Sequence, residues 1–202
     1  MKNIIYNHNT ITPSKIICIG RNYVEHIEEL NNEIPSSMVI FNKPNSAISN
    51  TLRYFKEDTR FEGEICFLIG NKKIVGVGFG LDLTHAGIQN QMKKKGLPWE
   101  RAKAFNGSAI FSEFVPFEGK IKELNMRLYI NDKLVQFASY DLMIYKPNSM
   151  LQEIDSFMSL EDGDVIMSGT PKGVNSYRID DRFLGQIFSN KELLTEKEWV
   201  VK

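Results

Sequence analysis

The sequence predicts an α+β fold in which β-strands dominate and a few short helices accompany them. Short apolar runs recur along the chain, turn residues separate several of them at hairpin spacing, and segments with helical periodicity are few. Because hairpins join several of the predicted strands, we expect a mixed and mostly antiparallel sheet. The length of 202 residues favours a single domain over residues 1–202.

The strands are predicted from apolar runs and from the turns between them. The polar, irregular segment 45–60 is expected to be a loop that could close over a site. The expected strands cover residues 15–19 and 38–41, the hairpin 61–69 with 73–81, the hairpin 126–130 with 133–138, and the short run 165–167.

Three segments have apolar residues at the spacing of a short amphipathic helix. Thr84 is the expected N-cap of the second helix, and Lys93, Lys94 and Lys95 complement the helix dipole at its other end. The segments are residues 21–32 with Tyr23, Ile27 and Leu30 on one side, residues 84–94 with Ile88 and Met92 inward, and residues 148–158 with Leu151, Ile154, Phe157 and Met158 inward.

Composition argues against several classes of partner. Lys and Arg total 25 and Asp and Glu total 25, so the formal net charge is zero and gives no footprint for nucleic acid or an anionic membrane. The apolar runs are far shorter than the ~20 residues that span a bilayer. The polar first ten residues contain no signal-peptide core, so we expect a cytoplasmic protein. Cys18 and Cys66 lie far apart inside apolar runs, which indicates buried thiols.

An acidic cluster is the first candidate site. Glu62 and Glu64 flank Gly63 at the start of a predicted strand, and strand alternation puts both side chains on one face. Counting back from the hairpin places Asp82 near the same end. Three buried carboxylates need a cation to stay ionised, so the pattern predicts a Mg²⁺ or Mn²⁺ site. Ordinary edge-strand acids paired with lysines are the alternative that the pattern leaves open.

A histidine and a glutamate form the second candidate. His26 and Glu29 are three residues apart on a predicted helix, so their side chains are neighbours. A carboxylate fixes the tautomer of an imidazole and raises its basicity, so the pair could activate a water. A surface histidine beside a helical glutamate is the alternative. His8 and His85 have no such partner and receive no role.

A series of short motifs, taken together, is typical of one family. They are Ile19-Gly-Arg-Asn-Tyr23 with His26, Lys43-Pro44, Phe61-Glu-Gly-Glu64, Leu81-Asp-Leu-Thr84, Lys93-Lys-Lys-Gly-Leu-Pro-Trp99, Ala102-Lys-Ala-Phe105, and Asp162-Gly-Asp164 through Ser168-Gly-Thr-Pro-Lys-Gly-Val174. In this order, over about residues 16–174, they resemble the fumarylacetoacetate hydrolase family, most closely its acylpyruvase and oxaloacetate decarboxylase branch.

The resemblance implies a rolled, mixed β-sheet, a homodimer and a small oxo-acid substrate. It implies that Glu62, Glu64 and Asp82 bind Mg²⁺ or Mn²⁺. By position, His26 and Glu29 match the water-activating dyad, Lys103 matches the lysine that stabilises a developing enolate, and Arg21, Lys43, Gln89 and Thr170 match positions that hold the carboxylate and keto oxygens of the substrate.

Two segments depart from the family pattern. Many relatives have an arginine at the position of Ala86, so a cation for a second substrate carboxylate is absent there. We expect this absence to penalise dicarboxylates, unless a protonated His85 replaces the charge. After Val174 the chain has Asn175-Ser-Tyr177 in place of a Gly-rich run, and residues 191–202 contain no clear motif.

Together, the residues and the resemblance predict a metal-dependent hydrolase that cleaves a carbon–carbon bond in a short 2,4-dioxo acid, such as an acylpyruvate, through a pyruvate enolate. Oxaloacetate decarboxylation uses the same enolate without water attack. Keto–enol tautomerisation or isomerisation of a related diacid needs only proton transfer. These reactions share one site and stay open, as does an inactive homologue that only binds a metal or a carboxylate.

Overall fold

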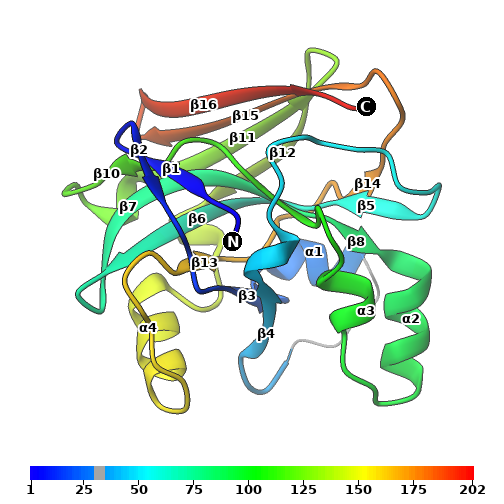
Figure 1. Ribbon diagram of the computed structural model, residues 1–202, viewed down its shortest axis with the longest axis horizontal. Helices are drawn as coiled ribbons and strands as arrows, with labels where there is room; N and C mark the ends of the chain where they lie inside the picture. Colours follow the sequence, from blue (N-terminus) through cyan, green and yellow to red (C-terminus); the bar gives the residue numbers. More distant parts are fainter. Residues whose placement is uncertain (30–34) are drawn as a thin grey trace.

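The computed structural model describes residues 1–29 and 35–202, and a mixed sheet lies at its centre (Figure 1). The strand order is β10 (Val115–Pro116), β7 (Lys73–Asp82), β6 (Gly63–Gly70), β13 (Val165–Met167), β3 (Lys15–Gly20) and β4 (Val39–Pro44), and β9 (Ala109–Phe111) also pairs with β7. In this sheet β3 and β13 run parallel, and the other described pairs are antiparallel. The predicted fold class is confirmed.

A second sheet packs on one face of the central sheet and encloses the larger part of the core with it (Figure 1). Its order is β12 (Lys133–Ser139), β11 (Leu124–Ile130), β15 (Arg182–Ser189) and β16 (Glu192–Val200). The sheets approach closely at Gly185, where an added Cβ would lie 2.3 Å from the Phe79 ring. Phe79 also packs on Trp199, with ring centroids 5.9 Å apart.

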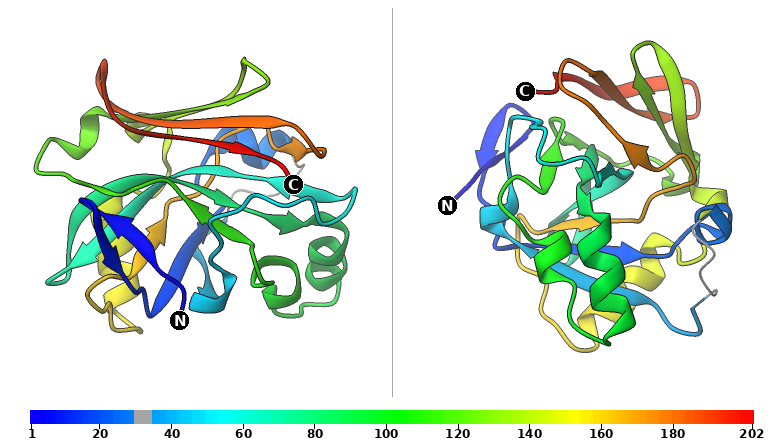
Figure 2. Two further views of the ribbon diagram at one scale, coloured as in Figure 1. Left: turned by 45° about the horizontal axis from the view of Figure 1, so that its top comes forward. Right: turned by 90° about the vertical axis from the view of Figure 1, so that its right-hand side faces the viewer.

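Short helices and small sheets close the ends of this rolled structure. Figure 2 shows α2 and α3 side by side at one end. The helices are α1 (Val24–Glu29), α2 (Ala86–Lys94), α3 (Glu100–Lys103) and α4 (Pro147–Asp155), with the short 3-10 helices η1 (Asn45–Ala47), η2 (Ile121–Glu123) and η3 (Tyr140–Leu142). The small sheets are β1 (Ile4–Tyr6) with β2 (Asn9–Ile11), and β14 (Asn175–Ser176), β5 (Thr59–Phe61) and β8 (Thr84–His85) in that order.

Both predicted hairpins are confirmed, and their turns explain why. Asn71 and Lys72 have φ values of 50° and 58°, and Asn131 and Asp132 have φ values of 50° and 65°. Two consecutive residues with positive φ form the two-residue turn whose twist matches that of paired strands, and Asn and Asp tolerate this conformation best after Gly. These turns fix the register of β6 with β7 and of β11 with β12.

The helix boundaries differ from the predicted ones. The second helix begins at Ala86 rather than Thr84, because the Thr84 hydroxyl donates to Glu62 Oε1 at 2.6 Å instead of capping the helix. The first begins at Val24, since Arg21 has a left-handed φ of 55°. The predicted inward position of Leu30 lies outside the described residues. The third is α4, which starts one residue early and ends at Asp155, so Phe157, expected to point inward, lies beyond the helix and is 59% exposed.

Three further segments differ from what the sequence indicated. The strand expected over 61–69 is divided at Glu62, because the Gly63 amide donates to the Gln136 side chain rather than to a strand partner. The expected loop 45–60 contains η1 and ends in β5. The middle of this segment is fixed to the fold rather than free to close over the site. Leu52 is buried, and its carbonyl accepts a hydrogen bond from the Lys202 amide at 3.0 Å. The segment 191–202, which has no clear sequence motif, contains β16, and β16 pairs with β15 along the whole strand.

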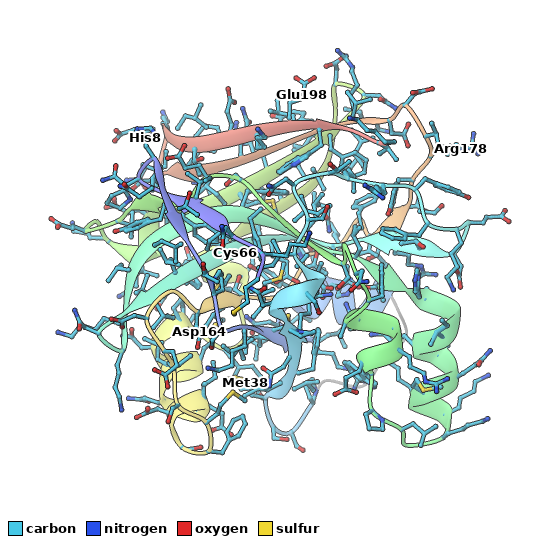
Figure 3. The ribbon with its side chains drawn as sticks, in the orientation of Figure 1. His8, Met38, Cys66, Asp164, Arg178 and Glu198 are labelled. Carbon is cyan, nitrogen blue, oxygen red and sulfur yellow. The ribbon has the colours of Figure 1, made fainter. Side chains whose placement is uncertain are left out.

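The two cysteines are buried thiols, as predicted. Cys66 lies in the interior of the molecule, whereas His8, Arg178 and Glu198 lie at its periphery (Figure 3). Burial raises the pKa of both Cys18 and Cys66, so their thiols stay protonated. Across the described ranges, none of the helices is both long and apolar enough to cross a bilayer.

Candidate metal centre and substrate cleft

The candidate site lies where β3, β6, β7 and β13 reach the same edge of the central sheet. Because β3 and β13 are parallel, both end at this edge. β6 runs antiparallel to β13 and therefore begins there, while its hairpin partner β7 ends there. These strand ends supply Arg21 after β3, Glu62 and Glu64 at the start of β6, Asp82 at the end of β7, and Thr170 after β13.

Glu62, Glu64 and Asp82 form an acidic triad at this edge. Each offers one carboxylate oxygen, and these atoms all lie within 4.8 Å of one another. The backbone produces this convergence, because the Asp82 amide donates to the Glu62 carbonyl at 2.9 Å and Glu64 lies opposite Gly80. The register counted from the hairpin therefore places Asp82 beside the two glutamates, although Glu62 stands in a break between strands.

Glu64 is the triad carboxylate that forms no ion pair among the described residues. Burial raises the pKa of Glu64, and the Asp82 and Glu62 carboxylates raise it further. Glu64 accepts a hydrogen bond from the neutral Gly169 amide at 2.7 Å, while the ammonium groups at the triad pair with Glu62 and Asp82. Mg²⁺ or Mn²⁺ fits this set of donors, because such ions bind carboxylate oxygens and would neutralise the charge on Glu64.

Lys103 from α3 is the ammonium group in closest contact with the triad. Its Nζ donates to Asp82 Oδ2 at 2.7 Å, to Glu62 Oε2 at 2.8 Å and to Thr84 Oγ1 at 2.6 Å. Burial alone would lower the pKa of Lys103, but the Asp82 and Glu62 carboxylates raise it above its ordinary value. The group therefore stays a fixed positive charge at neutral pH, aimed at the base of the cleft.

Lys43 from β4 is a second ammonium group in contact with the triad. Its side chain is fully buried, and its Nζ is 2.7 Å from Asp82 Oδ1 in an ion pair without hydrogen-bond geometry. The same ammonium donates to Ser108 Oγ at 3.0 Å and to the Lys103 carbonyl. These contacts attach β4 to Asp82 at the end of β7 and to Lys103 in α3.

His26 and Glu29 of α1 are paired as the helical spacing predicts. His26 Nδ1 lies 3.3 Å from Glu29 Oε2, and the Glu29 oxygens also accept the Gly173 amide at 3.1 and 3.2 Å. An ionised carboxylate only accepts hydrogen bonds, so Nδ1 carries the proton and Nε2 is the basic atom. His26 is 7% exposed and lines the same cleft as the triad.

A cleft of about 480 Å³, measured with its opening to solvent, unites these groups. Of the residues proposed from the sequence, Glu29 and Lys43 stand outside its lining, each in contact with a residue that lines it. The others line it: Arg21, His26, Glu62, Glu64, Asp82, Gln89, Lys103 and Thr170.

Six residues of the cleft lining received no site role from the sequence, and three of them matter for the charge of the cleft: Phe41, Lys93 and Trp99. The sequence analysis explained Lys93 as a positive charge that complements the dipole at the end of a helix. The signal that could have found it is its spacing, since Lys93 stands four residues after Gln89 and so shares a helix face with it.

The Thr170 hydroxyl is engaged with the protein. It donates to the Gly63 carbonyl at 3.0 Å and accepts from Gln136 Nε2 at 2.9 Å, and Gln136 Oε1 in turn accepts the Gly63 amide at 2.8 Å. Gln136 belongs to β12, so this network ties the second sheet to the strand start that carries the triad.

His85 does not supply a positive charge beside Ala86, the position where the family resemblance implies an arginine. The His85 ring stacks on Phe105 with centroids 3.8 Å apart and an interplanar angle of 11°, and its Nδ1 lies 3.0 Å from Thr59 Oγ1. Burial, with a smaller contribution from Lys56, lowers the pKa of His85 to about 4. A protonated His85 that replaces the arginine at neutral pH is therefore not supported.

A comparison with protein families shows which family the chain belongs to. Residues 15–200 match the model of the fumarylacetoacetate hydrolase C-terminal family. The chain belongs to the fumarylacetoacetate hydrolase family. Oxaloacetate tautomerase YcgM of Escherichia coli is 34% identical to this family member over 187 residues, which are 83% of this chain and 85% of the relative.

Solved structures of the family agree with this fold. A structure from Oleispira antarctica, assigned as a fumarylacetoacetate isomerase/hydrolase, is 33% identical, with a TM-score of 0.95 and 100% of each chain covered. The fumarylpyruvate hydrolase of Pseudomonas aeruginosa, solved in complex with Mn²⁺ and pyruvate, is 25% identical, with a TM-score of 0.89 over 99% of this chain and 95% of its own.

Proposed function

We propose that this chain is a divalent-metal-dependent enzyme that interconverts the keto and enol forms of a short 2-oxo dicarboxylic acid such as oxaloacetate. One observation carries the proposal: the imidazole of His26 lines the same cleft as the acidic triad, and the ammonium of Lys103 contacts two carboxylates of the triad. The name of the Escherichia coli relative, an oxaloacetate tautomerase, favours this reaction over the hydrolysis expected from the sequence.

Glu62, Glu64 and Asp82 are the proposed metal ligands. Their clustered oxygens and the raised pKa of Glu64 support a divalent cation, as does the Mn²⁺ in the Pseudomonas aeruginosa structure. Bound there, the cation would supply Lewis-acid polarisation of the carboxylate and 2-keto oxygens of the substrate. Mg²⁺ and Mn²⁺ both fit this site, since both prefer hard oxygen ligands.

His26 is the proposed base. Its Nε2 removes a proton from C3, the electrons of that bond form the C2=C3 double bond, and the π pair of the 2-keto group moves onto its oxygen. Lys103 stabilises the negative charge that develops on this oxygen. The oxygen then takes a proton from solvent and His26 releases the C3 proton to solvent, so the net change is one proton lost from C3 and one gained by oxygen.

Acylpyruvate hydrolysis is the second candidate. The contact between His26 and Glu29 favours it, because a base oriented in this way can also deprotonate water. That water would attack the distal carbonyl, and Lys103 would stabilise the departing pyruvate enolate. Oxaloacetate decarboxylation would use Lys103 in the same manner without the water. The fumarylpyruvate hydrolase of Pseudomonas aeruginosa supports keeping these reactions in the test.

Parallel assays on the purified chain separate these reactions. The ultraviolet absorbance of enol-oxaloacetate reports tautomerisation, and pyruvate release from oxaloacetate, acetylpyruvate and fumarylpyruvate reports decarboxylation and hydrolysis. We expect Mg²⁺-dependent acceleration of enol decay that EDTA abolishes. Faster pyruvate release than enol decay would contradict the proposal in favour of a carbon–carbon lyase or hydrolase. No turnover of any substrate would indicate a binding protein.

A further inference from the structure

Lys93 differs from the two lysines that follow it on the chain. Its side chain is half-buried and lines the cleft, whereas Lys94 and Lys95 are exposed. It lies one helical turn beyond Gln89 on α2, and Ala86 begins the same helix face three residues before Gln89. Lys93 therefore presents a positive charge to the cleft from α2.

An aromatic pair holds Lys93 in this position. Its Nζ lies 5.2 Å from the centroid of the Trp99 ring, within the range of a cation–π contact. Trp99 packs on Phe41 with centroids 5.7 Å apart, and the Lys103 ammonium lies 5.3 Å from the Phe41 ring. The aromatic pair thus connects the ammonium at the triad with a second ammonium further along the cleft.

The charges of the cleft leave Lys93 available to a ligand. Lys103 is neutralised by Glu62 and Asp82, but no carboxylate of the described residues forms an ion pair with Lys93. Arg21, Lys93 and Lys103 line the cleft and Lys43 contacts Asp82 beside it, so a divalent cation at the triad would give the cleft an excess of positive charge. Such an excess complements a dianion better than a monoanion.

We infer that Lys93, supported by Trp99, is the residue that binds the second carboxylate of a dicarboxylic substrate. This inference rests on the proposed function, in which the first carboxylate and the 2-keto oxygen lie at the triad. Lys93 then selects oxaloacetate over pyruvate, which is the same 2-oxo acid without the second carboxylate.

The pKa of Lys93 supports this role. Burial and the nearby Arg21 lower it to about 8, so the ammonium is present at neutral pH and is lost in mildly alkaline solution. Lys103 and Arg60 lower it further, and Glu62 opposes them. The preference for a dicarboxylate should therefore fall as the pH rises through about 8.

The test compares Lys93→Met with Lys94→Met, its exposed neighbour. For each variant we would measure kcat and KM for oxaloacetate and the competitive inhibition constant of pyruvate, all with Mg²⁺. In Lys93→Met the KM should rise about tenfold, equivalent to ~1.4 kcal/mol, while kcat and the pyruvate constant change less than about threefold. Lys93→Arg should restore most of the preference, and Lys94→Met should match the wild type.

Two outcomes would overturn the inference: an unchanged KM for oxaloacetate in Lys93→Met, or an equal loss of oxaloacetate and pyruvate binding. Calorimetric titration of the wild type and Lys93→Met with both ligands keeps the test independent of turnover. If the wild type binds oxaloacetate more tightly than pyruvate without converting it, the proposed function fails, and the loss of that preference in Lys93→Met still supports Lys93.

Discussion

Asp82 is the residue on which both buried lysines depend. Lys43 lies 2.7 Å from one of its oxygens and Lys103 lies 2.7 Å from the other. Buried charges are tolerated when they are paired, and Asp82 pairs with both ammonium groups. Removing one member therefore leaves an uncompensated charge rather than a simple gap.

Lys43→Met should destabilise the fold by about 3–5 kcal/mol, the usual cost of breaking a buried ion pair from one side. The matched control is Lys172→Met, which removes an exposed pair with Glu25 and should cost less than about 1 kcal/mol. Urea denaturation in EDTA measures both without a contribution from metal. Equal losses in the two variants would show that Lys43 does not stabilise the site through its charge.

His26→Ala tests the base. If Nε2 moves the C3 proton, kcat for oxaloacetate tautomerisation should fall by about 10²-fold or more, the usual scale for a general base. Acylpyruvate cleavage, where it occurs, should fall at least as much, and decarboxylation should suffer less because it needs mainly an electron sink. Steady-state kinetics with His8→Ala as the exposed control make the comparison. Equal losses in all reactions would assign His26 to substrate binding.

At the scale of single residues, the sequence was most informative where spacing alone brings groups together. Alternation along a strand and a two-residue turn place Glu62, Glu64 and Asp82 at one edge, and three-residue spacing pairs His26 with Glu29. The role of Lys93 depends on Trp99 and Phe41, which come from other elements. No local pattern contains that contact, so only the fold reveals it.

At the scale of elements, His85 at the junction between β8 and α2 makes the stability of the fold depend on pH. The folded-state pKa of His85, about 4, lies below its ordinary value of 6.5. Between these values the unfolded chain binds a proton that the folded chain does not, so stability falls as the pH decreases through this window. Above about pH 6.5 the contribution is fully present.

The melting temperature of the wild type should therefore fall more between pH 7 and pH 5 than that of His85→Gln, which does not titrate. His8→Gln, at an exposed histidine, should retain the wild-type response. Differential scanning calorimetry at the two pH values measures these slopes, and an NMR titration of the His85 ring gives the pKa directly. A wild-type slope equal to that of His85→Gln would contradict the neutral, stacked imidazole.

Elements with strong local signals were predicted, and those that depend on distant partners were not. The turns at Asn71 and Asn131 specify their own hairpins. By contrast, Thr84 has the chemistry of a helix cap, yet its hydroxyl bonds Glu62 because the folded chain brings that carboxylate within 2.6 Å. β15 joins the second sheet by pairing with β11, and β16 joins it by pairing with β15. The tail 191–202, which contains β16, has no sequence motif that predicts this strand.

At the scale of the whole molecule, one sheet edge collects residues from the beginning, middle and end of the chain. Each strand direction follows from its pairing, so the triad, the base and the lysines meet only in the complete fold. The second sheet supports this edge through Gln136 and Thr170. The homodimer implied by the family resemblance stays a prediction, which sedimentation equilibrium would test.

The most direct test of the account is a titration with Mn²⁺ followed by electron paramagnetic resonance. The wild type should bind the ion at a site whose spectrum changes when pyruvate is added. Glu64→Gln should weaken Mn²⁺ binding by at least about 10²-fold, beyond the loss typical of a residue next to a ligand. Glu198→Gln, at an exposed acid, should bind as the wild type does. Equal Mn²⁺ affinity in the wild type and Glu64→Gln would contradict a metal centre at the triad.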